Sequence, residues 1–173
     1  IAMEFSHIAA IAGARVMMAV RGGRCLKRFE PELTEELCRA THALGVEVVY
    51  NSPPHSIEKT GSGLLLRAGI TGEQRLEADM VVHGAGRVPD LDPLDLKAAG
   101  IAVSGGLPVL DEFLKTTNPN VYAAGDAAGR SQLTPTATME GRAAAANILH
   151  GDHVRPDYSL VPSVTFTNPP LGG

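Results

Sequence analysis

The sequence lacks several features that would assign it to a functional class at once. It has no long run of Lys or Arg, and its formal net charge is −4, so nucleic acids and anionic membrane surfaces are not expected partners. No apolar stretch approaches the roughly 20 residues that span a bilayer, and no charged leader precedes a short apolar core. We therefore expect a cytoplasmic protein without a membrane segment.

Cysteine is scarce, and reactive motifs are missing. The spacing of Cys25 and Cys38 matches neither a redox CxxC motif nor a zinc site, which favours a structural role. His150 and His153 flank a Gly-Asp pair, but no further ligand completes a metal site, and the other histidines show no catalytic grouping. A nucleophile elbow, a Walker loop and paired carboxylates are also absent. We predict no catalytic residue and no metal site in this chain.

What the sequence does contain is an alternation of helical and strand-like segments. Residues 1–12 repeat apolar side chains at helical spacing and end at Gly13, and residues 15–20 are apolar after the first, as in a buried parallel strand. A helix over 31–45 and a strand over 46–50 repeat this order. Since parallel strands need helical crossovers, the order predicts a Rossmann-like, doubly wound α/β unit.

The pattern changes after this unit. Short runs between 57 and 79, separated by Gly-containing turns, predict an antiparallel β-meander, and residues 80–83 predict a central strand. Proline and aspartate crowd residues 89–95, where we place a domain crossover. A buried strand over 121–124 and a long helix over 135–150 are then expected.

The sequence patterns at both ends of the chain lead us to expect a fragment of a longer protein. The first helix begins without a capping residue, and residues 162–170 read as a strand that stops at a proline pair with no further element to pair with it.

Gly125 and Asp126 follow the strand expected at 121–124. Ligands of open α/β sheets bind beyond the carboxyl ends of strands, and a carboxylate there can accept hydrogen bonds from polyol hydroxyls while a glycine admits close approach. The alternative is a plain turn or a helix cap. Residues 133–135 (Leu-Thr-Pro) then begin the long helix and leave its positive dipole end free, which favours developing negative charge.

Together these residues carry a resemblance to a known family. Residues 116–126 (TTNPNVYAAGD), followed by 133–135 and by Glu140-Gly141-Arg142, resemble the second FAD-binding motif of the pyridine nucleotide-disulfide oxidoreductases, the family of glutathione reductase and mercuric reductase. Three further stretches resemble that family in the same order, namely the residues after its second Gly-rich loop (1–5), its Gly-Arg-x-Pro segment (82–90) and the entry into its dimerisation domain (162–170).

The resemblance implies a domain organisation. Residues 1–89 would form the NAD(P)-binding domain without its first strand and Gly-rich loop. Residues 90–156 would form the C-terminal part of the FAD-binding domain, and residues 157–173 the start of the dimerisation domain of a homodimeric parent protein.

The resemblance also implies site residues. Asp126 with Gly125 would contact the flavin ribityl chain, and the backbone of Leu133 and Thr134 would face the pyrimidine end of the flavin. The remaining positions implied are Gly86 and Arg87 near FAD, Glu4 near the nicotinamide carboxamide, and Val164 in the nicotinamide pocket. Without the family, Glu4 and Arg87 would be read as solvated surface residues.

The loop after residues 15–20 bears on the choice of pyridine nucleotide. NAD-binding folds place Asp or Glu there for the ribose 2′-hydroxyl, whereas this chain has Arg21, followed by Arg24, Lys27 and Arg28. Basic residues can bind a 2′-phosphate through charge-assisted hydrogen bonds, and Arg21 and Lys27 align with the family's phosphate-binding pair. We therefore expect NADP in preference to NAD; the alternative is a solvated basic loop.

These expectations describe part of an FAD-dependent oxidoreductase. The parent protein would pass hydride from NADPH to FAD and on to a disulfide or related small-molecule acceptor. The family's redox cysteine pair lies outside this chain, so the fragment alone is expected to have no turnover. Two alternatives stay open: a flavoprotein without the cysteine pair, such as an NADH oxidase or ferredoxin reductase, and a non-catalytic dinucleotide-binding module.

Overall fold

The computed structural model describes all 173 residues, which form two compact units. The first unit comprises Ile1–Ala85 together with Pro162–Gly173, and the second comprises Gly86–Val161. None of the helices combines the length and the apolar surface that crossing a bilayer requires.

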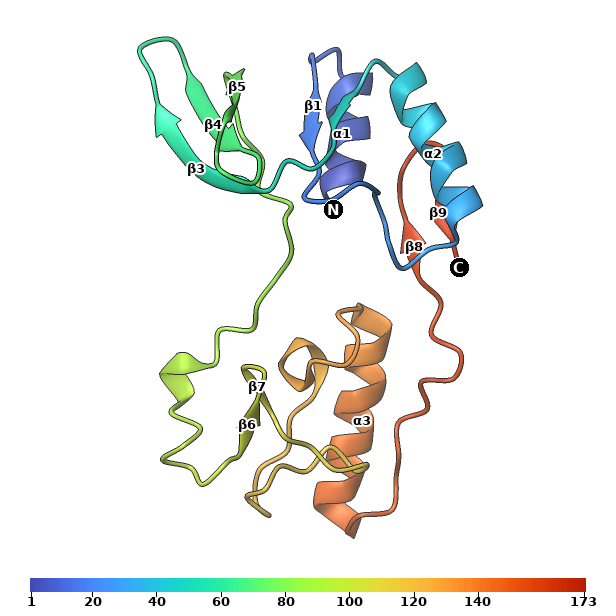
Figure 1. Ribbon diagram of the computed structural model, residues 1–173. Coiled ribbons are helices and arrows are strands. Elements are labelled where there is room, and N and C mark those ends of the chain that lie inside the picture. The colour runs from blue at the N-terminus through green and yellow to red at the C-terminus, as the bar shows by residue number, and fades with distance from the viewer. The chain divides into compact units, whose positions relative to one another are not determined.

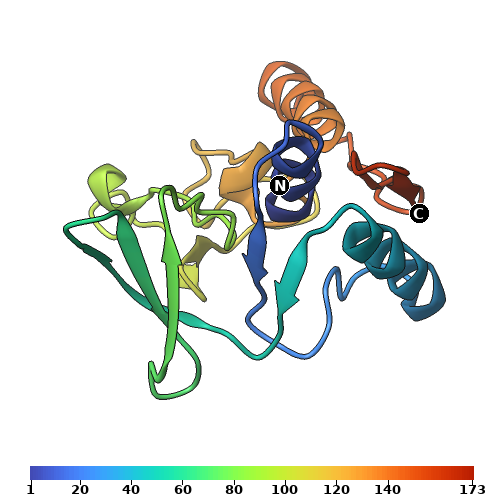
Figure 2. The same cartoon turned by 90° about the horizontal axis from the view of Figure 1, so that it is seen from above.

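The first unit is built on the predicted alternation of helices and strands. Helix α1 (Ala2–Ile11), strand β1 (Met17–Ala19), helix α2 (Pro31–Ala43) and strand β2 (Glu47–Val49) follow in that order (Figures 1 and 2). β1 and β2 pair in parallel, with Met18 opposite Val48. The α/β fold class expected from the sequence is thus confirmed.

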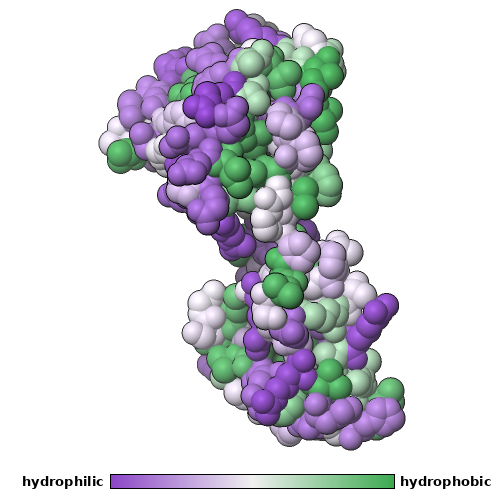
Figure 3. Space-filling view, turned by 90° about the vertical axis from the view of Figure 1, so that its right-hand side faces the viewer, coloured by the Kyte–Doolittle hydropathy of each residue, from purple (hydrophilic) through white to green (hydrophobic).

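The core of this unit joins both ends of the chain. Met3 of α1, Met18 of β1 and Leu37 of α2 are buried together, and Leu171 from the last residues of the chain joins them. The burial of these side chains supplies the apolar contact that holds short elements in place. Apolar side chains also reach the surface of the protein (Figure 3), and those most exposed on α1 are Phe5, Ile8 and Ile11.

A three-stranded antiparallel sheet follows as predicted. It consists of β3 (Pro54–Lys59), β4 (Leu64–Ala68) and β5 (Gln74–Ala78), with β4 in the centre. Leu65 and Ala68 of the central strand are buried.

The second unit is dominated by one long helix, α3 (Thr134–His150), as predicted. Its buried residues Ala143 and Ala144 pack against Leu114. The remaining elements are short: the 3-10 turn η1 (Asp92–Leu94), strands β6 (Val103–Ser104) and β7 (Leu107–Pro108), and the 3-10 turn η2 (Gly125–Ala128).

Two predicted strands are wrong. Residues 80–83 form no strand, because β1 and β2 pair only with each other and offer this segment no partner; Met80 is 76% exposed. Residues 121–124 make only a single bridge, between Tyr122 and Lys115. An apolar run predicts a strand only where a neighbouring backbone can complete its hydrogen bonds.

The prediction of an unpaired strand at the end of the chain is also wrong. β8 (Val164–Thr165) pairs in antiparallel fashion with β9 (Leu171–Gly172), which lies beyond the proline pair. The intervening residues turn the chain back on itself, and this hairpin belongs to the first unit.

Candidate functional site

The loop after β1 lies at the carboxyl edge of the parallel strand pair. The Ser52 amide donates to the Val20 carbonyl at 2.8 Å, and the Asn51 amide donates to the Gly22 carbonyl at 3.1 Å. The loop is therefore tied to the residues that follow β2, and Arg21 reaches across to the Ala85 carbonyl with an Nη2–O distance of 3.3 Å. This is the edge at which open α/β sheets bind ligands.

The positive charges of this loop are free of carboxylates. Arg21, Lys27 and Arg28 are exposed, and Arg24 donates to the Lys27 carbonyl at 2.9 Å; none of the four forms an ion pair. The Lys27 ammonium lies 3.2 Å from the position that a Cβ on Gly22 would take. The structure thus places Lys27 beside the residue that follows Arg21, with both cations available to an anion.

Glu4 lies in the first turn of α1 and contacts the C-terminal hairpin. Its Oε1 accepts a 2.8 Å hydrogen bond from the Phe166 amide. Burial raises the pKa of Glu4, but hydrogen bonds from the Ile1 amino group and from Phe166 outweigh this, so its pKa is lowered overall. Val164, two residues before Phe166, is partly exposed on β8. The structure therefore brings Glu4 close to the segment that carries Val164.

His7, one turn beyond Glu4 on α1, was missed by the sequence analysis. Its side chain is 1% exposed and lies between the Thr41 hydroxyl (2.8 Å) and the Asn168 amide (3.0 Å). Burial lowers the pKa of this imidazole. The available signal was a histidine three residues after Glu4 in a helix whose other residues, apart from Ser6, are apolar.

In the second unit, Arg87 and Asp126 form an ion pair. Arg87 Nη2 lies 3.2 Å from Asp126 Oδ2, and their side chains are 73% and 33% exposed. The structure thus brings together two residues that are 39 positions apart in the sequence and that were both predicted to lie near one ligand. Gly86, just before this arginine, has a φ of +117°, which favours glycine.

The backbone amide of Gly125 is hydrogen-bonded to a buried carboxylate. Its amide donates to Glu140 Oε2 at 2.6 Å, and the Tyr158 hydroxyl donates to Glu140 Oε1 at 2.8 Å. Burial raises the pKa of Tyr158. Glu140 is completely buried, and although the sequence motif contains it, its role as a link between Gly125, α3 and Tyr158 emerges only from the fold.

The beginning of α3 offers unpaired polar groups. Leu133 occupies the N-cap position without a side-chain cap, and Thr134 and Pro135 follow, so the first amides of the helix have no side-chain partner. The Thr136 hydroxyl is buried and has no hydrogen-bond partner. This set of donors beside Asp126 fits the polar edge of a flavin and a polyol chain.

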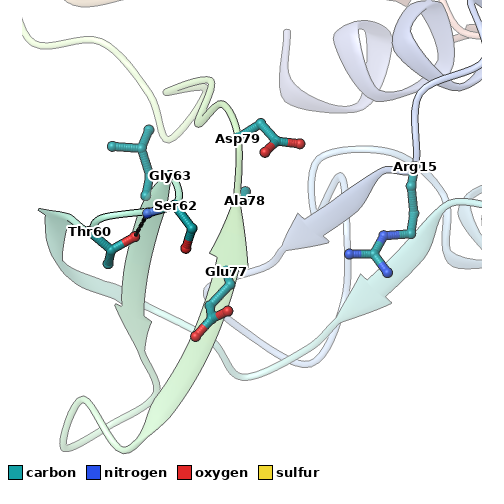
Figure 4. A pocket seen from close by; sticks show the side chains of 8 residues that line it. Arg15, Thr60, Ser62, Gly63, Glu77, Ala78 and Asp79 are labelled. Carbon is teal, nitrogen blue, oxygen red and sulfur yellow. Dashed lines mark hydrogen bonds between the residues drawn. The ribbon is translucent and has the colours of Figure 1, made fainter.

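A shallow hollow of about 190 Å³ lies elsewhere in the first unit (Figure 4). Arg15 forms one side, and Glu77 and Asp79 are among the residues on the other. The walls mix both signs of charge, and none of the predicted cofactor-binding residues lines it, so we assign it no ligand.

Cys25 and Cys38 pack in the core of the first unit rather than at an exposed site. Tyr50 donates to Cys38 Sγ at 3.7 Å. Burial, together with the neighbouring Cys38 thiol, raises the pKa of Cys25 to about 11. A buried thiol that stays protonated at neutral pH is a poor nucleophile, which supports the structural role expected from the sequence.

Comparison with known proteins matches the chain to one family. The pyridine nucleotide-disulphide oxidoreductase family matches residues 1–141. The chain is 34% identical over 173 residues to the mercuric reductase of Bacillus cereus, covering 99% of the chain and 27% of the relative. It is 31% identical to the chloroplastic/mitochondrial glutathione reductase of Pisum sativum, covering 100% of the chain and 31% of that protein.

Solved structures agree with these relatives. LpdA of Mycobacterium tuberculosis superposes with a TM-score of 0.87 at 27% identity, covering 98% of the chain and 37% of that structure. The flavoprotein disulfide reductase RclA of Escherichia coli gives a TM-score of 0.85 at 26% identity, covering 97% and 38%. The chain spans about a third of the length of the proteins it matches. It belongs to the pyridine nucleotide-disulphide oxidoreductase family.

Proposed function

We propose that this chain supplies parts of both dinucleotide sites of an FAD-dependent oxidoreductase that takes hydride from NADPH and delivers electrons to a disulfide or related acceptor. NADP is favoured over NAD because the cations Arg21 and Lys27, in the loop after β1, have no carboxylate partner. A 2′-phosphate would satisfy them through charge-assisted hydrogen bonds. Glu4 and Val164 would lie at the nicotinamide end.

The second unit would hold the flavin. Asp126 would accept hydrogen bonds from the ribityl hydroxyls, with Gly125 allowing close approach and Gly86 and Arg87 beside them. The backbone at Leu133 and Thr134 would donate to the pyrimidine edge, and the positive end of α3 favours negative charge there. When bound, the flavin supplies the hydride-accepting and electron-passing chemistry.

The two cysteines of this chain do not identify the electron acceptor. Cys25 and Cys38 are not assigned a redox role, because the Cys25 thiol is buried and stays protonated. A disulfide acceptor follows the names of the relatives, whereas the cysteine-independent flavoprotein and the non-catalytic module remain alternatives. The homodimeric parent, the cytoplasmic location and the assignment of residues 157–173 to a dimerisation domain also remain predictions.

Titration of the 173-residue chain with NADP and NAD tests the nucleotide assignment. Arg21→Glu should weaken NADP binding about tenfold to a hundredfold, because a charged hydrogen bond to phosphate is worth about 1.5–3 kcal/mol, and should change NAD binding much less. Arg28→Glu makes the same charge change in the same loop and should weaken NADP binding less than Arg21→Glu does. Equal losses of NADP and NAD affinity in Arg21→Glu would overturn the assignment.

A further inference from the structure

A chain of hydrogen bonds through His7 connects three parts of the first unit. The Asn168 amide, in the C-terminal hairpin, donates to His7 Nδ1 at 3.0 Å. His7 Nε2, on α1, lies 2.8 Å from Thr41 Oγ1 on α2. The imidazole is 1% exposed, so water does not compete for either nitrogen.

Only one protonation state of the His7 imidazole satisfies both of these hydrogen bonds. The Thr41 hydroxyl donates to the Leu37 carbonyl at 2.7 Å, so it must accept its second hydrogen bond from His7 Nε2. A backbone amide can only donate, so His7 Nδ1 must accept from Asn168. The hydrogen-bond network therefore assigns a neutral imidazole with its proton on Nε2.

Protonation of His7 would place two donors opposite each other, at Nδ1 and at the Asn168 amide. No carboxylate is in contact with the ring to compensate. α2 presents the Thr41 hydroxyl, and the hairpin presents the Asn168 amide. The titratable side chain nearest along α1 is Glu4, which accepts from the Ile1 amino group and the Phe166 amide. A buried charged imidazole without a partner is unfavourable, so the contact with Asn168 would open instead.

The contact matters because it fixes the segment that faces the proposed nicotinamide site. Two hydrogen bonds join α1 to this hairpin, Phe166 to Glu4 and Asn168 to His7. The first is exposed, whereas the second involves a buried ring. Loss of the second would leave the exposed Phe166–Glu4 hydrogen bond as the remaining one between α1 and this hairpin, whose Leu171 stays packed in the core.

We propose that His7 is a positioning residue that holds residues 164–168 against α1 only while its imidazole is neutral, and that NADP affinity therefore falls in acid. This inference rests on the proposed function, since Glu4 and Val164 must line the nicotinamide end for the ligand to sense the change. It concerns how the site is held together, and no step of the reaction is assigned to His7.

Hydrogen exchange of the 173-residue chain tests the positioning role without any ligand. The variant His7→Gln can accept from Asn168 and donate to Thr41 but does not titrate. Between pH 8 and pH 5, protection of the 166 and 168 amides, corrected for intrinsic exchange, should fall about tenfold in the wild type and less than about twofold in His7→Gln. His42→Gln, at an exposed position next to Thr41, should behave as the wild type. Parallel loss of protection in the wild type and His7→Gln would overturn the proposal.

Titration with oxidised NADP over the same pH range tests the link to the ligand. Because the 2′-phosphate itself titrates near pH 6, the readout is the ratio of the wild-type and His7→Gln affinities at each pH. That ratio should fall about twofold in acid, because the apparent affinity falls in proportion to the population that keeps the His7–Asn168 contact, and a constant ratio would overturn the coupling. NADP binding no tighter than NAD binding by either protein at pH 8 would instead contradict the proposed function, while the exchange experiment still decides the role of His7.

Discussion

Gly125 and Glu140 are joined by a 2.6 Å hydrogen bond from the glycine amide to the carboxylate of a completely buried side chain. This bond fastens the turn that presents Asp126 to the middle of α3. The Tyr158 hydroxyl occupies the other oxygen of the same carboxylate. Glu140 thus connects the proposed flavin site to the body of the second unit.

Removal of this carboxylate should destabilise the second unit. Glu140→Leu leaves the Gly125 amide and the Tyr158 hydroxyl without their acceptor, at a cost of about 1–3 kcal/mol for each unsatisfied group. Glu140→Gln retains an acceptor and should cost less. Urea unfolding measures both. Glu112→Leu removes an exposed ion pair with Arg155 and should change stability by less than about 1 kcal/mol; a Glu140→Leu loss no larger than this would contradict the assigned link.

Gly125→Ala should destabilise the protein through its backbone. Gly125 has a φ of +71°, and an added Cβ would lie 3.2 Å from the Ala137 Cβ, so we expect a loss of about 1–2 kcal/mol. Gly141→Ala is the matched control, because it lies in α3 with no atom within 4 Å of the new Cβ. That variant should gain up to about 1 kcal/mol in the free energy of unfolding. The same sign of change in both variants would refute the argument.

Asp126→Ala should weaken flavin binding without unfolding the chain. Its ion pair with Arg87 is partly exposed and contributes about 1 kcal/mol or less to stability. Loss of hydrogen bonds to a polyol chain should reduce FAD affinity about tenfold or more. Quenching of flavin fluorescence measures the affinity, with Glu112→Ala as a control for removal of an exposed carboxylate. An unchanged FAD affinity would remove Asp126 from the proposed site.

Alkylation should distinguish the two cysteines. The pKa of Cys25 is raised to about 11 by burial and by Cys38, so iodoacetamide at pH 7.5 should modify Cys38, which is only half-buried, well before Cys25. Mass spectrometry of the digested chain identifies the modified residue. In urea both thiols should react at similar rates, and preferential labelling of Cys25 in the folded chain would show that its environment is not apolar.

The stability of the first unit should depend on pH through His7. Burial lowers the pKa of His7 from its ordinary value of 6.5, so in acid the unfolded chain binds the proton more readily than the folded chain. The contribution is therefore fully present above about pH 6.5 and decreases as the pH falls below it toward the lowered pKa. Urea unfolding at pH 8 and pH 5.5 should show a smaller loss for His7→Gln than for the wild type. Identical losses would show that other groups account for the acid sensitivity.

Local patterns predicted the elements whose structure is decided by nearby residues. α2 begins at Pro31, and α3 follows Leu133, as proline at the first turn indicates. The meander between β3 and β5 was also predicted, because glycine-containing turns fix antiparallel neighbours. Strands that need a distant partner were predicted less well. Residues 80–83 have no neighbouring strand with which to pair, and β8 pairs with β9, which follows the proline pair that had predicted the end of the sheet.

The sequence by itself determined the family, the order of helices and strands, and the residue types of the candidate sites, because a Gly-Asp pair before a helix and a basic loop after a strand are short-range signals. The tertiary structure decided which of these residues meet. It paired Arg87 with Asp126 and joined Glu140 to the Gly125 amide by a hydrogen bond. It also set His7 between Thr41 and Asn168, which lie 127 residues apart in the sequence. Such contacts depend on packing between distant segments, and no local spacing encodes them.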